Sequence, residues 1–360
     1  MEPAAQTKER VSEFNVAAHG LRGVACLFVL VAHILVGVAE HVYPGHRDYV
    51  SLVQVPSYFG TFGVYLFFVI SGYVVLPSAI RYPPGEFALR RWLRVYPLFF
   101  AFSLLFVLLN ALTNAYPKQN SVEAVIAGFL FLDLFTATEQ LTPNAWSLTY
   151  EVIFYVLTCA CVFAALRQSR TSIRLLAFGV AAAFLVVEPL SIYFVIGIAI
   201  RMLHRMRPRE ADRGSRLLEL LCMGCLIVAV ASGRRELEWD TILDPGLFAT
   251  LTLTAAYFYL ATVPGSLSAS WLSARVVAYA GTISFSLYLT HPYIYFPLRQ
   301  AFVRAGLFTE NVAPSVGLFF VLVTALSFAA SHIVYRVLER HPYEWFFRQR
   351  IYRVGGRRPA

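Results

Sequence analysis

The chain has 360 residues, of which 58% are hydrophobic, 15% aromatic and only 14% charged, whereas a soluble domain carries roughly 25% charged residues. This composition excludes a water-soluble globular protein. The formal net charge is +9, but the arginines lie at the ends of apolar segments rather than on a solvated basic face, so the charge does not indicate a nucleic-acid partner. We expect a multi-pass protein embedded in the lipid bilayer.

Apolar stretches alternate with short connections along the chain, and a membrane-spanning helix needs about 20 predominantly apolar residues. The stretches cover residues 23–39, 58–78, 95–112, 124–137, 146–165, 173–187, 190–203, 217–232, 246–262, 276–297 and 313–337. The sequence therefore predicts an all-α integral membrane protein.

The distribution of arginine predicts which connections face the cytoplasm, because Lys and Arg concentrate on that side of a membrane. The arginine-rich connections are 81–94, 167–174, 201–216 and 336–358. The connection 234–244 carries more acidic than basic residues, so we expect it on the outer side.

Two cytoplasmic connections must be separated by an even number of crossings, yet three apolar stretches lie between 81–94 and 167–174. The stretch 124–137 is the shortest of the three and contains Asp133, so we expect a short re-entrant or interfacial helix that does not cross. About ten transmembrane helices remain, which places both termini in the cytoplasm. The expected divisions are a cytoplasmic N-terminal segment at 1–18, a transmembrane domain at 19–345 and a basic cytoplasmic tail at 346–360.

Ionisable side chains inside a membrane span are costly, which makes them candidates for function. His33 follows Arg22 by eleven residues in the first stretch. At about 100° per residue both side chains lie on one helix face, about 16 Å apart along the axis. We expect Arg22 at the cytoplasmic mouth and His33 near the middle of the bilayer. The alternatives are a snorkelling anchor for Arg22 and a hydrogen-bonded packing histidine for His33.

Arg91 and Arg94 lie three residues apart at the start of the third span, so they share one helix face at the level of Arg22. Three guanidinium groups at one mouth predict an anion clamp, since a guanidinium binds phosphate through two parallel hydrogen bonds. A coenzyme A thioester is a phosphate-rich ligand of this kind. The alternative is that these are ordinary arginines that set the topology.

Two further ionisable residues lie within predicted spans. Glu151 follows Trp146 by five residues and is expected about 8 Å below the outer surface, where its carboxylate can pair with an arginine or orient His33 or a sugar hydroxyl. His291 lies toward the outer half of its span and precedes Pro292, which can free a backbone carbonyl. Both a catalytic and a structural role stay open for His291.

The sequence lacks the signals of two other classes of protein, metal-binding proteins and transporters. Cys222 and Cys225 have CxxC spacing, but no second ligand pair or histidine lies nearby, so we expect no metal site. No internal repeat occurs, whereas transporters of this size usually have repeated halves.

Six segments in order resemble the membrane-bound acyltransferase-3 family, whose members acylate glycans outside the cytoplasm and some small molecules. The resemblance covers about residues 19–345. The matching segments are LRG with Arg22 and His33, FFVISG at 67–72, Arg-x-x-Arg at Arg91 and Arg94, WSLTYEVIFY from Trp146, SFSLYLTHP with His291, and VLERHP with Glu339. Tyr65 departs from the pattern, because the family often has an acidic residue there.

The resemblance implies a role for each of these residues. Acetyl-CoA, a co-substrate rather than a bound cofactor, would bind from the cytoplasm with its phosphates on Arg22, Arg91 and Arg94. Its thioester would reach His33, which would act as a general base or as a transient acyl carrier, with Glu151 as a second catalytic residue. Acceptor contacts or structural roles are implied for Ser71, Trp146, Tyr288 and His291.

The sequence thus predicts an acyltransferase of groups other than aminoacyl groups, and specifically an O-acetyltransferase that acts on a sugar hydroxyl of an exopolysaccharide, lipopolysaccharide or oligosaccharide. The expected partners are the acyl-CoA donor, a glycan or lipid-linked sugar, and the bilayer. Two alternatives stay open: acylation of a small molecule such as a macrolide or lipid, and a transporter or flippase. The scarcity of lysine beside arginine indicates a GC-rich bacterial genome, and hence a bacterial cytoplasmic membrane.

Overall fold

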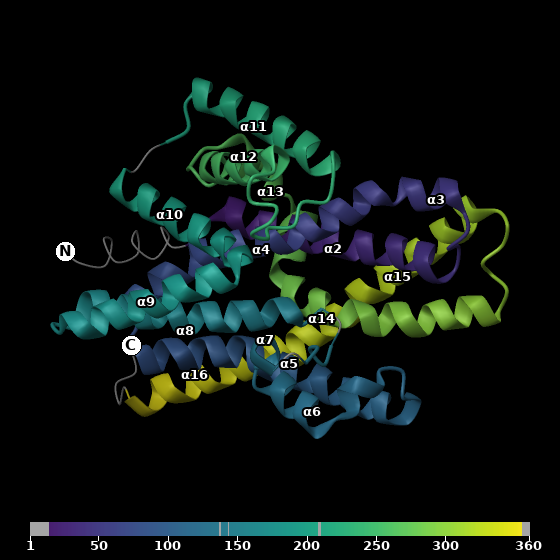
Figure 1. Cartoon of the computed structure of the whole chain (residues 1–360), viewed down its shortest axis with the longest axis horizontal. Coiled ribbons are helices and arrows are strands. Elements are labelled where there is room, and N and C mark those ends of the chain that lie inside the picture. Colours follow the sequence, from purple (N-terminus) through teal and green to yellow (C-terminus); the bar gives the residue numbers. More distant parts are fainter. Residues whose placement is uncertain (1–13, 137, 143, 208–209, 355–360) are drawn as a thin grey trace.

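The computed structural model describes residues 14–136, 138–142, 144–207 and 210–354. Within these ranges every regular element is a helix and no strand occurs (Figure 1), which confirms the all-α class. Residues 1–13 of the expected N-terminal segment and 355–360 of the expected tail lie outside the described residues.

The long helices form where the apolar stretches predicted them. Their bounds are α2 (Val16–His41), α4 (Gln54–Arg81), α5 (Pro84–Thr113), α8 (Trp146–Arg167), α9 (Thr171–Val187), α10 (Ile192–Met206), α11 (Arg213–Ala231), α12 (Pro245–Ala261), α14 (Arg275–Arg304) and α15 (Val312–Val334). Shorter elements connect or extend them: α3 (Arg47–Leu52), η1 (Pro117–Asn120), α6 (Val122–Phe129), α7 (Asp133–Thr136), η2 (Pro189–Ser191), α13 (Leu267–Leu272), the π-helical turn η3 (Tyr335–Arg340) and α16 (His341–Val354).

Seven helical segments of the described chain are long and apolar enough to cross a membrane. The first is α2, and the last is the continuous helix formed by α15, η3 and the start of α16. Two other apolar helices, α9 and α12, have 17 residues each, and α14 has 30 residues with several polar side chains among them. The chain is therefore a multi-pass membrane protein. The helix α16 runs through the start of the expected basic tail.

The stretch 124–137 does not form one long helix. It is divided between α6, with 8 residues, and α7, with 4 residues, and Phe131 between them has a positive φ of 56°. A helix of eight residues is about 12 Å long, whereas the hydrocarbon core of a bilayer is about 30 Å thick. This agrees with the expectation that the stretch does not cross as a helix.

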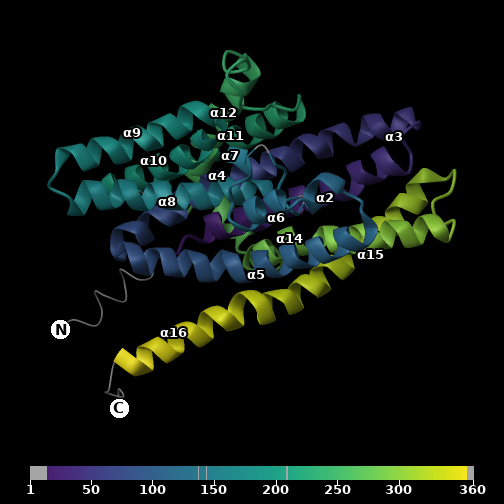
Figure 2. The same cartoon turned by 60° about the horizontal axis from the view of Figure 1, so that its bottom comes forward.

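Several helix connections and helix ends lie at one of two ends of the bundle. The α8–α9 connection and the far end of α16 lie at one end, on the left of both views, whereas α3 and the α14–α15 connection lie at the other (Figures 1 and 2). The first end carries the arginine-rich connection 167–174. We call it the basic end and the other the opposite end.

The helix α2 packs between α4 and α14, and α4 packs in turn against α10. The crossing of α4 and α10 is close enough to require glycine. A Cβ atom on Gly72 would lie 2.0 Å from the Phe194 carbonyl oxygen, and one on Gly197 would lie 2.0 Å from the Val69 carbonyl oxygen. Small residues at such crossings let two backbones approach closely inside a membrane, so Gly72 of the FFVISG segment serves helix packing.

Candidate active site

The two histidines of the predicted spans lie in direct contact. His33 Nδ1 on α2 lies 2.7 Å from His291 Nε2 on α14, and the two rings are stacked with their centroids 5.0 Å apart. The contact follows from the packing of α2 against α14. Nothing in the local sequence predicted it, since 258 residues separate the two positions.

The second ring nitrogen of His291 determines where the protons of this pair lie. His291 Nδ1 lies 3.0 Å from the Leu287 carbonyl oxygen, which can only accept, so Nδ1 carries a proton and donates it. In a neutral ring Nε2 is then the acceptor, and His33 must donate to it from Nδ1. His33 Nε2 therefore keeps its lone pair, as a general base or a nucleophile requires.

A proline next to His291 connects the pair to the start of α8. Pro292 has no N–H that could bond the Tyr288 carbonyl one turn earlier, and that oxygen accepts a 2.6 Å hydrogen bond from Asn144 Nδ2 instead. The Tyr288 hydroxyl donates in return to the Asn144 carbonyl at 2.8 Å. These two bonds fix the residues before Trp146 against α14.

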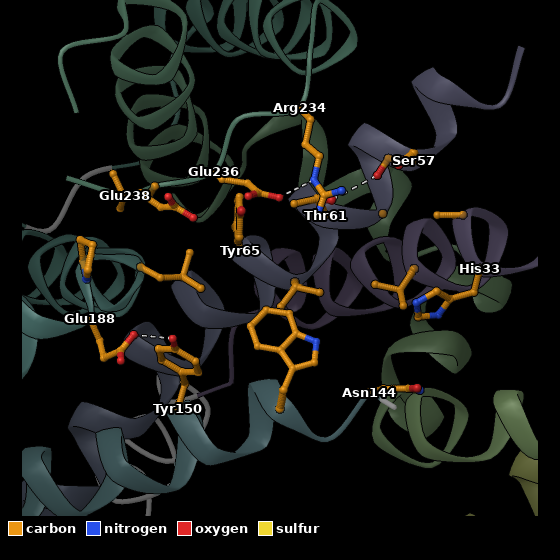
Figure 3. Close-up of a pocket in the computed structure, with 18 of the residues that line it drawn as sticks. His33, Ser57, Thr61, Tyr65, Asn144, Tyr150, Glu188, Arg234, Glu236 and Glu238 are labelled. Atoms are coloured by element: carbon orange, nitrogen blue, oxygen red, sulfur yellow. Dashed lines mark hydrogen bonds and ion pairs between the residues drawn. The ribbon is translucent and has the colours of Figure 1, made fainter. Parts of the chain in front are cut away.

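A cavity of about 580 Å³ opens beside the histidine pair, a volume in the usual range of small-molecule sites. Its wall includes His33, Tyr65, Trp146, Tyr150 and Tyr288. The His33 side chain is exposed although α2 is packed between two helices, and Figure 3 shows its ring directed toward the cavity. Two of the residues expected to contact an acceptor, Trp146 and Tyr288, thus lie in one wall with His33.

The connection between α11 and α12, residues 232–244, supplies a further part of this wall. Arg234, Glu236, Glu238 and Trp239 all line the cavity. The sequence predicted this connection only as an outer loop, because neither its length nor its charge indicates which helices it lies over. Its unusual number of acidic residues was the one available signal.

Three contacts hold this 232–244 segment in place. Leu237 is only 4% exposed, and Trp239 Nε1 donates a 2.6 Å hydrogen bond to the Val186 carbonyl at the end of α9. Arg235 forms a 2.8 Å ion pair with Asp244, the residue that caps α12. The segment therefore presents a defined set of side chains to the cavity.

The three arginines of the predicted anion clamp belong to one cluster near the basic ends of α2 and α5. Arg22 interacts electrostatically with Arg94, Glu151 and Glu339, and Arg91 interacts with Arg94 and Glu151. Helix periodicity predicted one shared face for Arg91 and Arg94, and the distribution of arginine predicted the same level for Arg22. The two carboxylates among them were not predicted at this place.

Arg91 is held by contacts of its guanidinium with α4 and α8. Its Nη2 donates to Ser78 Oγ at 2.6 Å, and the guanidinium carbon lies 5.4 Å from the centre of the Tyr155 ring. The buried Nε has no hydrogen-bond partner among the described residues. An unpaired buried donor costs about 1–3 kcal/mol.

Glu151 lies in the arginine cluster. Ser71 Oγ donates to Glu151 Oε1 at 2.7 Å, and the Tyr155 hydroxyl donates to the same oxygen. Of the alternatives expected for Glu151, the pairing with arginine fits this geometry, because Glu151 interacts with Arg91 and makes no hydrogen bond with His33 in the described structure. Ser71 is not part of the cavity wall, and its hydroxyl instead holds the carboxylate.

Glu339 is a site residue that the sequence did not single out, apart from its place in the VLERHP segment. It lies in the π-helical turn η3, and such widened turns are frequent at functional sites. Its carboxylate accepts a 2.8 Å hydrogen bond from Ser286 Oγ and interacts with Arg94 and Arg22. The arginines around Glu339 in the sequence made it resemble an ordinary charge at a helix end.

The arrangement thus combines a nitrogen base that faces a cavity with a separate cluster of cations. An imidazole lone pair can take the proton of a hydroxyl or attack an acyl carbon, and guanidinium groups can bind phosphates. In the part of the chain that the structure describes, no group of three His, Cys, Asp or Glu residues could hold a metal ion.

Comparison with known proteins identifies the family. The model of the acyltransferase 3 family, described as an acyltransferase domain, matches residues 15–335. No curated protein and no solved structure matches the chain. Because the family model matches most of the chain, this protein belongs to the acyltransferase 3 family and is a membrane acyltransferase.

Proposed function

We propose that this protein transfers an acyl group, specifically acetyl, from a cytoplasmic acyl-CoA to a hydroxyl of an exopolysaccharide, lipopolysaccharide or oligosaccharide sugar. One observation carries the proposal. His33 faces a cavity with Nε2 unpaired, and Arg22 of the cation cluster lies on the same helix about 16 Å away. A thioester can therefore be held by its phosphates at one place while its acyl group reacts at another.

The proposal requires the cation cluster and the cavity to open toward opposite sides of the membrane. If α9, α12 and α14 cross in addition to the seven apolar segments, the chain crosses ten times and both termini lie on one side. The positive-inside rule then assigns the basic end to the cytoplasm. The 232–244 segment faces outward, in a bacterial cytoplasmic membrane.

In this scheme the arginines bind the acyl-CoA donor. Arg22, Arg91 and Arg94 bind the phosphates of coenzyme A, and the extended pantetheine arm carries the thioester along α2 toward His33. Glu151 and Glu339 orient the guanidinium groups and reduce the net charge of the cluster from three to one, which limits the repulsion among the arginines.

His33 can complete the transfer by either of two routes. As a general base, Nε2 takes the proton of the sugar hydroxyl while its oxygen attacks the thioester carbonyl; the C–S bond breaks, and the thiolate takes the proton back from the imidazolium. As a carrier, Nε2 attacks the carbonyl first, the C–S bond breaks, and coenzyme A leaves as the thiolate. The sugar oxygen then attacks the acyl carbon, the N–C bond breaks, and the freed Nε2 takes the hydroxyl proton and passes it to water. His291 positions the ring in both routes.

A small molecule such as a macrolide or lipid is the second candidate acceptor. The size of the cavity accommodates part of such a molecule as readily as a sugar unit. Transport is the alternative of another class, and the family match favours acyl transfer over it.

The decisive experiment follows acetyl-CoA consumption by purified protein in liposomes that contain a bacterial glycan acceptor. We expect His33→Ala to abolish the transfer, whereas His41→Ala, an exposed position on the same helix, leaves it unchanged. Mass spectrometry after rapid denaturation near neutral pH distinguishes the two routes, since only the carrier route leaves an acyl group on His33. Full transfer by correctly inserted His33→Ala protein would refute the proposal, and solute counterflow without thioester cleavage would favour transport.

A further inference from the structure

The cavity wall carries charged side chains that take no part in the proposed reaction at His33. Its charged side chains are Arg234, Glu188, Glu236 and Glu238, which give this part of the wall a formal charge of −2. Figure 3 shows the three carboxylates on the side of the cavity away from His33. A ligand that extends from the imidazole across the cavity must contact them.

The positive charge in this wall is already paired. Arg234 Nε lies 2.5 Å from Glu236 Oε1. Glu188 accepts a 2.5 Å hydrogen bond from the Tyr150 hydroxyl, which leaves its charge uncompensated. Glu238 is exposed, and no described residue donates a hydrogen bond to its carboxylate. Two carboxylates, Glu188 and Glu238, therefore determine the electrostatic character of the wall.

The same wall offers aromatic surfaces. Trp146 is 38% exposed and Trp239 is 53% exposed, and Tyr65 is stacked on Tyr193 with the ring centroids 4.8 Å apart. Aromatic faces can pack on the C–H faces of a sugar ring, whereas an ionised carboxylate can only accept hydrogen bonds. The matching ligand is a ring that carries several donors, either hydroxyl or ammonium groups.

We propose that this cavity is the acceptor site and that it selects against anionic acceptors. It takes a neutral sugar unit or an amino-substituted one, and it rejects uronic acids and other carboxylated sugars. The inference rests on the proposed function, because it places the acceptor hydroxyl at His33. Repulsion between carboxylates in a confined cavity of low dielectric exceeds that at an open surface. The wall therefore weakens the binding of a carboxylated sugar and strengthens the binding of a sugar that carries a protonated amine.

The 232–244 segment supplies one of the two uncompensated carboxylates, Glu238, and the other, Glu188, directly follows α9. Tyr65 stands where the family pattern often has an acidic residue, and it interacts electrostatically with Glu236, Arg234 and Glu238. The uncompensated negative charge of the wall thus comes from Glu238 in the connection between α11 and α12 and from Glu188 after α9, rather than from α4.

The charge of the cavity can be measured before the natural acceptor is known. His33→Cys places a thiol in the wall. This thiol is labelled with a cationic and with an anionic methanethiosulfonate, and mass spectrometry of the peptide that contains position 33 gives the two rates. The reference thiol comes from Glu310→Cys, an exposed position in the α14–α15 connection. We expect the cation-to-anion rate ratio at position 33 to exceed the reference ratio by about fivefold or more.

Charge removal in the His33→Cys protein provides the matched comparison. Glu188→Gln together with Glu238→Gln is expected to bring the ratio at position 33 close to the reference value. Glu310→Gln, which removes a carboxylate outside the cavity, is expected to leave the ratio unchanged. Equal ratios at positions 33 and 310 before any charge is removed would overturn the inference.

A second measurement uses the unmodified protein with acetyl-CoA and three acceptors of one size: methyl glucoside, methyl glucosaminide and methyl glucuronide. We expect the glucuronide to be acetylated at least about tenfold more slowly than the other two, and Glu188→Gln with Glu238→Gln to narrow the difference. Equal rates for glucuronide and glucoside would overturn the inference. If thioester is never consumed while the labelling ratio shows the expected selectivity, the proposed acyl transfer fails and the charge selectivity of the cavity stands.

Discussion

His33 Nδ1 and His291 Nε2 lie 2.7 Å apart, and the remaining nitrogen of His291 is bonded to the Leu287 carbonyl. The chain of bonds therefore runs from a fixed backbone oxygen through one imidazole to the other. Its consequence is that the tautomer and orientation of His33 are set by α14, although His33 belongs to α2.

His291→Ala is expected to lower kcat by about 100-fold, because His33 loses the acceptor that fixes its tautomer, while KM for acetyl-CoA stays nearly constant. His291→Gln can accept a hydrogen bond through its side-chain oxygen and should recover part of the activity. Steady-state kinetics on both variants test this. Equal losses in the two variants would mean that His291 acts by packing alone.

Arg91→Ala is expected to raise KM for acetyl-CoA by about tenfold with a smaller change in kcat, since it removes a charged donor that contacts phosphate. Arg91→Lys keeps the charge but loses the fork, and should lie between wild type and Arg91→Ala. The comparison variant is Ser78→Ala, which removes the side-chain contact of Nη2 and leaves the guanidinium in place. An unchanged KM in Arg91→Ala would contradict the phosphate clamp.

Glu339→Gln is expected to reduce turnover about tenfold while the protein still inserts, because the carboxylate that faces Arg22 and Arg94 is replaced by a neutral amide of equal size. Glu344→Gln, about one turn further along in α16, is expected to have little effect. Transfer rates normalised to protein in the membrane give the comparison. A loss of inserted protein in Glu339→Gln, rather than of turnover, would make Glu339 a structural residue.

Gly72→Ala is expected to destabilise the protein by about 2 kcal/mol or more, because the new Cβ meets a backbone carbonyl that cannot move aside. The matched variant is Gly179→Ala in α9, where nothing lies within 4 Å of the new Cβ. That substitution should be neutral or stabilising by up to about 1 kcal/mol. Thermal unfolding in detergent measures both, and equal melting temperatures would contradict the close crossing of α4 and α10.

Asp244 is expected to make the anchoring of the 232–244 segment dependent on pH. The pKa of its carboxyl lies below the ordinary value of 3.8, because the backbone N–H of Gly246, the Arg235 guanidinium and the backbone N–H of Leu247 stabilise the charged form. Stability from such a group is fully present above the ordinary pKa and is lost as the pH falls through the lowered one.

The difference in melting temperature between wild type and Asp244→Ala should therefore be constant from about pH 7 to about pH 5 and shrink only below about pH 4. Asp244→Asn keeps the cap but cannot ionise, so its difference from Asp244→Ala should not change with pH. A difference that already falls between about pH 6 and about pH 5 would assign the stabilisation to another group.

The helices were predictable from apolar length alone, because a span must satisfy its backbone internally whatever it packs against. The interruption at 124–137 followed from charge bias and from its short length, and the structure places α6 and α7 there. The shared helix face of Arg91 and Arg94 also followed from local periodicity. These predictions depend on one helix at a time.

The contacts between distant helices were not predictable in this way. His33 and His291, Glu151 and the arginines, and Glu339 and Ser286 meet because of how whole helices pack, and a single sequence carries no local signal for this. The place of the 232–244 segment over the cavity depends on three anchors, among them the bond from Trp239 to the Val186 carbonyl. A loop's charge indicates its side of the membrane and not its neighbours.

The pairing of α2 with α14 has a consequence for biosynthesis. The imidazole on α2 is translated 258 residues before its partner and cannot meet it until α14 has been translated and inserted. Nascent chains that lack α14 thus hold an unoriented histidine and should not cleave acetyl-CoA wastefully, so the order of translation itself delays the reactive centre until α14 is in place.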